Sequence, residues 1–203
     1  MHSSIPIIAL VGAATALPKI PFVTTNDIIP APVAIAARQN ACFVIGSNTL
    51  PDEVADVAAS LAPIVTCSNS ATTIAGVPDV TAGSVTYSSV DFGRSSESPL
   101  QFALRNFATD DSVANSNLQF FQDALNVYLA TEAGIRSVGG NLAIKVPKFF
   151  LEMQVSRIQT AQGNPPTAPG LQVDHLRDKV LKNAGREDQA LLDQVTFLAT
   201  KLQ

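Results

Sequence analysis

Residues 116–137 decide the fold of this chain, and they read SNLQFFQDALNVYLATEAGIRS. Apolar side chains recur in the segment at helical spacing, at Leu118, Phe121, Leu125, Tyr128 and Ile135. Side chains three, four or seven residues apart lie on one face of a helix. The segment therefore predicts a helix with one apolar face, which ends where Gly139 and Gly140 interrupt the pattern.

Further helical patterns precede and follow this segment. Ser98-Pro99-Leu100-Gln101 resembles a capping box, in which the serine side chain bonds the backbone at the start of a helix. Another helix starts near Asn141, and Pro147 predicts a kink or a restart within it. After a proline-rich loop at 163–170, two shorter helices are expected at about 171–184 and 187–202.

The region before these helices mixes one helix with β-strands. Thr49-Leu50-Pro51-Asp52 predicts a helix start, with Thr49 as the cap, proline in the first turn and carboxylates near the positive end of the helix dipole. Pro63 predicts the end of this helix, and a strand is expected at 64–67. Residues 72–92 are rich in β-branched residues and predict further strands, with a bulge or a strand end near Ser88.

Residues 5–16 form an uncharged apolar run that ends in Ala14-Thr15-Ala16. Small side chains at the first and third of these positions fit the pocket of signal peptidase, so residues 1–16 predict a signal peptide. The alternative is a buried N-terminal strand or helix. The run is too short to span a bilayer, which takes about 20 residues, and no transmembrane segment is predicted. We therefore expect a secreted, extracellular protein.

Residues 17–40 are rich in proline, which blocks helix and ladder hydrogen bonds, so this segment predicts an extended lead. Arg38 marks a candidate second processing site, which would make the lead a short pro-segment. The remaining residues, 41–203, are expected to fold as a single globular domain, since domains typically run about 100–200 residues.

The chain has two cysteines, Cys42 and Cys67. In an oxidising compartment a lone pair of cysteines usually forms a disulfide. A redox or metal-binding pair is the alternative, but the spacing differs from Cys-x-x-Cys and no cluster of histidines accompanies it. We expect a structural disulfide that contributes roughly 3 kcal/mol through its effect on the unfolded state.

Apolar residues make up 46% of the chain and charged residues 15%. This composition is too apolar for a disordered chain. The patterns above predict an α+β fold that is predominantly helical, in which a small disulfide-bearing α/β portion packs on a bundle of four or five helices.

The net charge is −4, and the sequence has no clustered basic face. Nucleic-acid binding normally requires such a face, so no nucleic-acid partner is expected. Lys145 and Lys148 form a close pair, which we interpret as solvated flanks rather than as a phosphate site.

Glu132 falls on the apolar face of the helix predicted at 116–137. A buried carboxylate is costly unless it is paired or bound to a metal. One hypothesis pairs Glu132 with Arg136, one turn later. The other is a ferritin-like di-iron site formed with Glu152 and His175. The Glu-x-x-His motifs of that architecture are absent, so no metal is predicted.

His175 is the one histidine that would remain after removal of the signal peptide. A Ser-His-Asp triad would have to use it, but the chain has no Gly-x-Ser-x-Gly motif to supply the nucleophile. We interpret His175 as a surface or half-buried helix residue beside a salt-linked ladder of Asp174, Asp178 and Lys182. No catalytic residue is assigned.

The short signal, the Pro/Ala-rich lead, the segment LPDEVAD at 50–56 and the Ala/Ser/Thr-rich strands occur together with one cysteine pair. This combination resembles uncharacterised small secreted proteins of filamentous fungi. The resemblance implies secretion and carries over no activity. The chain also resembles the hydrophobic-surface-binding, cell-wall mannoprotein type, which is helical and secreted, although the cysteine pair and the strands depart from that type.

A secretory start combined with few catalytic side chains favours a non-enzymatic secreted protein that acts by contact with a cell wall, a host or an apolar surface. A second hypothesis is an extracellular carrier that holds a small apolar ligand between helices, near Phe121, Tyr128 and Phe149. A third is a hydrolase that uses two carboxylates, as glycosidases do.

The sequence assigns no cofactor. The pair Phe149–Phe150 is interpreted as a core residue and its shoulder rather than as a binding cage.

Overall fold

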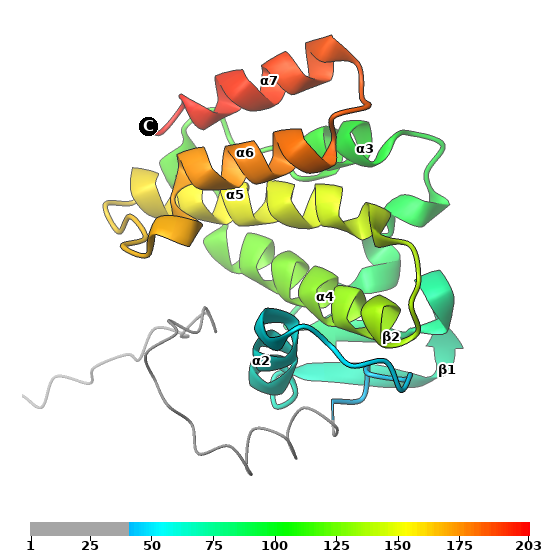
Figure 1. Ribbon diagram of the computed structural model, residues 1–203. Coiled ribbons are helices and arrows are strands. Elements are labelled where there is room, and N and C mark those ends of the chain that lie inside the picture. The colour runs from blue at the N-terminus through cyan, green and yellow to red at the C-terminus, as the bar shows by residue number, and fades with distance from the viewer. Residues whose placement is uncertain (1–40) are drawn as a thin grey trace, which may run out of the picture.

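The computed structural model describes residues 41–203, which form six α-helices and one three-stranded antiparallel sheet (Figure 1). The helices are α2 (Asp52–Leu61), α3 (Pro99–Asn106), α4 (Leu118–Ser137), α5 (Lys145–Ala161), α6 (Val173–Asn183) and α7 (Gln189–Ala199). The strands are β1 (Val65–Thr72), β2 (Pro78–Ala82) and β3 (Val85–Thr86), in the order β1-β2-β3. The predicted α+β, mostly helical fold is confirmed. The signal peptide predicted at 1–16 and the lead at 17–40 lie outside the described residues.

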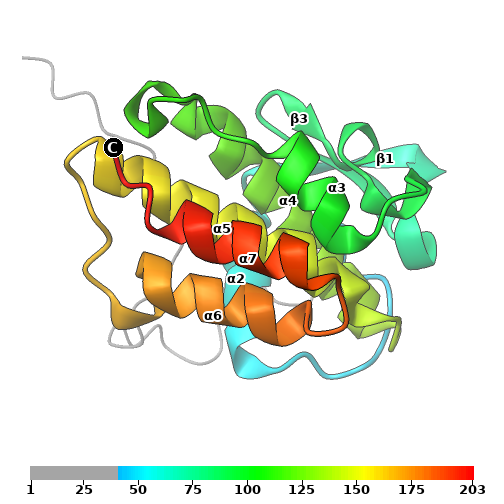
Figure 2. The same ribbon diagram turned by 90° about the horizontal axis from the view of Figure 1, so that it is seen from above.

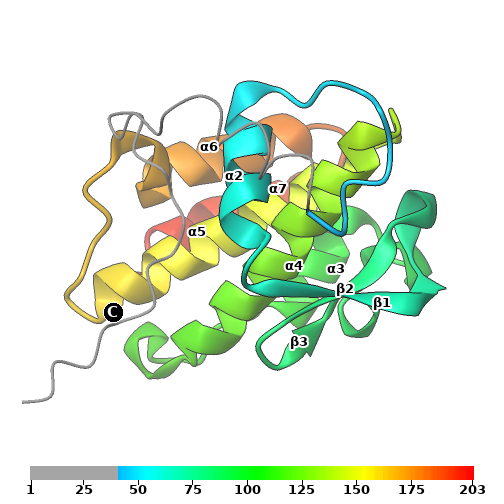
Figure 3. The same ribbon diagram turned by 90° about the horizontal axis from the view of Figure 1, so that it is seen from below.

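Helix α4 lies between the helical and the β-containing parts of the molecule. α5 packs along one side of α4, and α6 and α7 lie beyond α5 (Figure 1). Figure 2 shows α6 and α7 side by side over α5. Seen from below, α2 and the sheet cover the other side of α4 (Figure 3). None of the helices within 41–203 has the length and apolarity needed to cross a membrane.

Sequence features at both ends and in the middle of α4 explain its position. The side-chain oxygen of Asn117 accepts a 3.2 Å hydrogen bond from a backbone N–H of the first turn. Gly139 follows the last turn with a φ of 71°, which favours glycine, so the predicted end is confirmed. At Gly134 the backbone of Phe43 and the side chain of Val77 lie where a Cβ would be. A glycine is therefore required for α4 to pack closely against these segments.

The sheet is smaller than the β-like composition of residues 72–92 predicts. Residues 74–76 form a 3₁₀ turn, and β3 is only two residues long. Of the bulge or strand end expected near Ser88, the structure has the strand end, because β3 ends at Thr86 and Ser88 lies in the 3₁₀ turn that follows. The register shifts instead in β1, between Cys67 and Thr72, where the pairing with β2 becomes irregular.

Two expectations about helix starts are wrong. The residue that precedes α2 is Pro51 rather than Thr49, and no side chain caps its first turn. Pro147 neither kinks nor restarts a helix, because it is the third residue of α5. The N–H groups of a first turn have no partner within the helix, so a proline there removes no hydrogen bond. The start of α3 is as predicted, since the Ser98 hydroxyl accepts a hydrogen bond from the N–H of Gln101.

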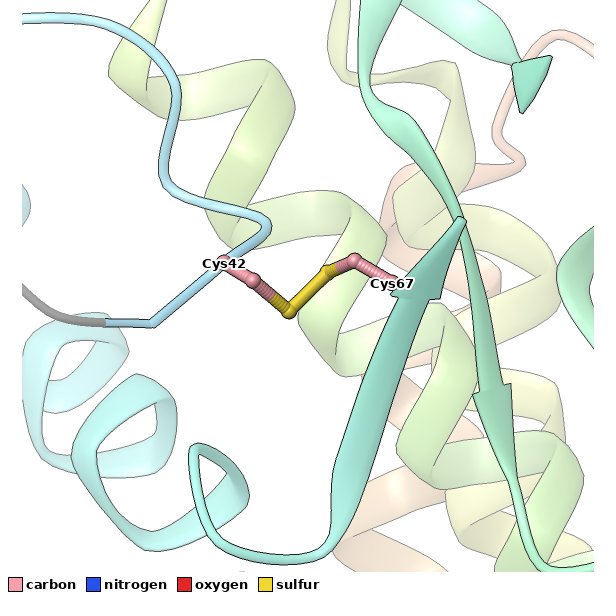
Figure 4. The surroundings of a disulfide bond; sticks show 2 residues. All are labelled: Cys42 and Cys67. Atoms are coloured by element: carbon pink, nitrogen blue, oxygen red, sulfur yellow. A yellow bond between two sulfur atoms is a disulfide. The ribbon is translucent and has the colours of Figure 1, made fainter. Parts of the chain in front are cut away.

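Cys42 and Cys67 form the expected disulfide, with 6.0 Å between their Cα atoms (Figure 4). Cys42 lies in the segment before α2, and Cys67 lies in β1, which follows α2. The bond therefore closes a loop that contains the whole of α2.

Removal of the disulfide should destabilise the fold without changing it. The Cys42→Ser/Cys67→Ser double variant is expected to lose roughly 3 kcal/mol of unfolding free energy, because the open chain gains entropy when it unfolds. Urea denaturation followed by circular dichroism measures the difference. Reduction of the native protein with dithiothreitol should cause the same loss. Unchanged denaturation midpoints in both cases would contradict a structural role for the bond.

Candidate functional site

A group of charged side chains is buried where α4 packs against α5. The ammonium nitrogen of Lys148 lies 3.0 Å from Oε2 of Glu132 and 3.8 Å from Oε1 of Glu152. The three side chains are 10%, 4% and 9% exposed, respectively. Together with Arg136 they form what we call the buried ion cluster: Glu132, Arg136, Lys148 and Glu152.

Arg136 binds the second oxygen of Glu132. Its Nε and Nη2 atoms lie 2.9 and 2.8 Å from Oε1 of that carboxylate. The ion pair expected one turn apart on α4 is therefore present. Because Lys148 contacts Oε2, both oxygens of Glu132 have a cationic partner, which offsets the cost of burying the carboxylate.

Lys148 is the member of the cluster that the sequence interpretation missed. Its interpretation as a solvated flank is wrong, because the residue is 8% exposed and its ammonium contacts α4. The spacing of residues around Lys148 could have indicated its burial. Lys148 lies on the helical stripe of three buried apolar residues, Ile144, Leu151 and Val155. It also precedes Glu152 by four residues, the spacing of an ion pair on one helix face.

Three lysines surround the ring of Phe149 at the edge of the cluster. The ammonium of Lys148 is 3.8 Å from the ring centroid, and those of Lys145 and Lys179 are 6.0 and 5.9 Å away. Cation–π attraction favours such positions. Lys179 belongs to α6, so this edge joins α5 to α6. Phe149 is partly buried and Phe150 is fully buried, as the interpretation of a core residue with its shoulder predicts.

Burial changes the acid–base properties of two side chains here. It raises the pKa of the Glu152 carboxyl above its ordinary value of 4.5, while the charge of Lys148 opposes the shift. Burial also lowers the pKa of the Lys145 ammonium below 10.5, and the nearby charge of Arg136 adds to this shift. Both groups are therefore easier to neutralise in the protein than in water.

The geometry of the cluster differs from that of a carboxylate-based hydrolase. A glycosidase places two carboxyl groups on either side of the bond that it cleaves. Here the ammonium of Lys148 lies between the carboxylates of Glu132 and Glu152 and interacts with both. In this arrangement the four side chains act as an internal ion-pair network that joins two helices.

The di-iron hypothesis would require Glu132, Glu152 and His175 to meet. The two glutamates do converge, but they converge on the ammonium of Lys148. His175 is an exposed residue of α6. Across the described residues 41–203, no three His, Cys, Asp or Glu side chains form a group that could hold a metal ion.

The charged ladder on α6 also differs from the expected one. Arg177 lies 2.9 Å from a carboxylate oxygen of Asp174 and 2.9 Å from one of Asp178. The arginine between the two aspartates thus replaces Lys182, the partner that we expected. Both carboxylates are largely exposed, so these ion pairs contribute little to stability.

Aromatic rings fill the space near Tyr128, where the carrier hypothesis places an apolar ligand. The ring of Tyr128 packs against Tyr87, Phe92 and Phe107, at centroid distances of 5.2, 6.5 and 5.8 Å. Its hydroxyl donates a 2.6 Å hydrogen bond to the backbone carbonyl of Val90. This region is therefore packed core, in which the aromatic contacts stabilise the fold.

A cleft of about 220 Å³ lies between α5, the start of α6 and the end of α7. Its apolar walls are made by Pro165, Pro166, Val173, Ala199 and Leu202. Pockets for drug-sized ligands typically measure about 300–1,000 Å³, so this cleft suits only a small molecule.

Residues 44–203 match a family described as a domain of unknown function, DUF7143. The chain belongs to this family. The DUF7143 match includes the whole buried ion cluster and Cys67, and it begins just after Cys42. The description of the family assigns no activity to it. No curated protein and no solved structure matches the chain.

Replacement of Lys148 by methionine should strongly destabilise the DUF7143 domain. The variant leaves Glu152 buried without its cation and removes one of the two cations on Glu132, and breaking a buried ion pair in this way costs about 3–5 kcal/mol. Urea denaturation at neutral pH measures the loss. Lys182→Met, which removes an exposed lysine of α6, is the matched control. Equal small effects of the two substitutions would show that the buried ion cluster does not stabilise the fold.

Glu152→Gln should change how the stability of the DUF7143 domain depends on pH. The folded-state pKa of Glu152 lies above its unfolded value, so the folded state binds this proton more tightly. The resulting stabilisation is complete below about pH 4.5 and is lost as the pH rises through the folded pKa. The advantage of the native protein over Glu152→Gln should therefore be largest at low pH and shrink as the pH rises above about 4.5.

Chemical denaturation at several pH values tests this expectation, with the exposed Glu53→Gln as control. The unfolding free energies of the native protein and of Glu53→Gln should run parallel. If the native protein instead gained stability over Glu152→Gln as the pH rises, the sign would be reversed and the argument contradicted.

Proposed function

We propose that this chain is an exported, non-enzymatic protein that acts by contact with a surface. The predicted signal peptide and the Cys42–Cys67 disulfide support export, because disulfides form and persist in oxidising compartments. The resemblance to secreted fungal proteins points in the same direction. Cell walls, host surfaces and apolar surfaces are the contacts that we consider.

The proposal that the protein is not an enzyme rests on Glu132 and Glu152, whose carboxylates form ion pairs inside the protein. Both carboxylates pair with Lys148 inside the helical core. Acid–base catalysis requires a side chain within hydrogen-bond reach of a substrate proton. A carboxylate that is buried in the core and paired there with a cation stabilises the fold instead of acting on a substrate.

Exposed apolar side chains support the contact part of the proposal. Ile45 and Val138 are 44% and 42% exposed. They lie close together, because the Ile45 N–H donates a hydrogen bond to the hydroxyl of Ser137, the neighbour of Val138. The disulfide begins nearby, at Cys42, and anchors this segment to the sheet. The two exposed side chains therefore belong to neighbouring segments, one of which the disulfide fixes covalently.

Adsorption measurements test this proposal on the purified full chain. We expect the protein to be depleted from solution by octyl-coated beads or by insoluble chitin or glucan particles. Ile45→Ser/Val138→Ser should reduce depletion by the octyl beads several-fold, because it removes the paired apolar side chains. The matched control is Ile64→Ser/Phe197→Ser, which replaces two exposed apolar residues on other elements and should behave like the native protein.

Three results would overturn the proposal. One is a native protein that is depleted by none of these surfaces. Another is hydrolysis of a substrate in an esterase, glycosidase and protease panel that is lost in Glu132→Gln or His175→Ala. A third is a small molecule that co-purifies in native mass spectrometry and is displaced by Leu202→Trp, which would favour a carrier that uses the 220 Å³ cleft.

A further inference from the structure

The edge of the buried ion cluster carries more positive than negative charge. Four cationic side chains gather there, and they meet two carboxylates, those of Glu132 and Glu152. The cations are Arg136, Lys145, Lys148 and Lys179. Two positive charges are thus left unbalanced, in a chain whose net charge is −4. An acidic protein that concentrates positive charge at one place has a local preference for anions.

The unbalanced charge belongs to Lys145 and Lys179. Every ion pair of the cluster uses Arg136 or Lys148. Within residues 41–203, neither Lys145 nor Lys179 has a carboxylate within ion-pair distance. Both are partly buried, so water screens them less than it screens a fully exposed lysine. Glu132 attracts Lys145 and Glu152 attracts Lys179, but neither carboxylate is within ion-pair distance, so the protein compensates the charge of these lysines only in part.

The protein places these ammonium groups around one aromatic ring. All three lysines lie within 6.0 Å of the centroid of one ring, that of Phe149. Cation–π attraction to the ring offsets part of their mutual repulsion. The pKa of Lys145 is lowered by burial first and then by the charge of Arg136; the carboxylate of Glu132 raises it, and Lys148 and Lys179 lower it further. An anion placed among these groups would relieve that repulsion.

We infer that Lys145 and Lys179, which lie at the ring of Phe149 beside the buried Lys148, form a binding site for a small doubly charged oxyanion, such as a phosphate group. Lysine ammonium groups donate hydrogen bonds and accept none, so their partner must supply acceptor oxygens. A dianion matches the two unbalanced charges of the site. This site is an addition to the proposed function and does not depend on it.

Titration of the purified full chain with inorganic phosphate tests the site. Sodium chloride keeps the ionic strength constant, so that general screening does not change. We expect saturable binding in calorimetry and a rise in the unfolding temperature with phosphate concentration, because a ligand of the folded state stabilises it. Amide resonances of Lys145, Phe149 and Lys179 should shift in nuclear magnetic resonance spectra during the same titration.

Substitution of the two unpaired lysines isolates their contribution. Lys145→Gln/Lys179→Gln should weaken phosphate binding about tenfold or more, because it removes two charge-assisted contacts. Both residues are partly exposed and outside the buried ion pairs, so the variant should retain the native circular dichroism spectrum. Lys182→Gln/Lys201→Gln removes the same charge from exposed positions and should bind phosphate like the native protein.

Any of three outcomes would overturn the inference. The first is an absence of saturable phosphate binding by the native chain. The second is equal weakening in the two double variants, which would indicate a response to net charge alone. The third is resonance shifts confined to other parts of the molecule, such as the start of α6.

Discussion

One ammonium group, buried between two carboxylates, joins the two longest helices of the described chain. Taking a charge out of water costs several kcal/mol, which is offset only while its partners stay in place. If α5 slid along α4 by one turn, about 5.4 Å, Lys148 would leave Glu132, and each buried charge would keep only the partner on its own helix, Glu152 and Arg136 respectively. We infer that this ion pair selects one register of the two helices, whereas apolar contacts alone would tolerate several.

The rest of the structure is built on the pair formed by α4 and α5. α6 and α7 pack on the α5 side, while α2 and the sheet pack on the α4 side. Close packing on the second side depends on Gly134, where a Cβ would collide with the backbone of Phe43. The disulfide then ties the segment of Cys42 to β1. An error in the α4–α5 register would therefore displace α6 and α7 relative to α2 and the sheet.

The parts that the sequence predicts are those set by local rules. The apolar stripe of residues 116–137 determines a helix, and the pair of Glu132 with Arg136 follows from the spacing of one turn. The contact of Lys148 with Glu132 crosses between helices, so no local rule contains it. The position of Lys179 beside Phe149 likewise depends on how α6 packs on α5. The sheet is short because β propensity depends on the pairing partner that tertiary structure supplies.

The helix-joining role of the cluster also explains why its edge is positive. A further carboxylate buried beside the cluster would be disfavoured, because burial already raises the pKa of Glu152 there. Lysines meet a smaller penalty, because their long apolar stems pack on the protein while the ammonium reaches toward water. A fold that uses its two buried glutamates to fix α4 against α5 therefore leaves Lys145 and Lys179 without a carboxylate. The same physical constraint that orders the helices thus produces a local excess of positive charge on an otherwise acidic protein.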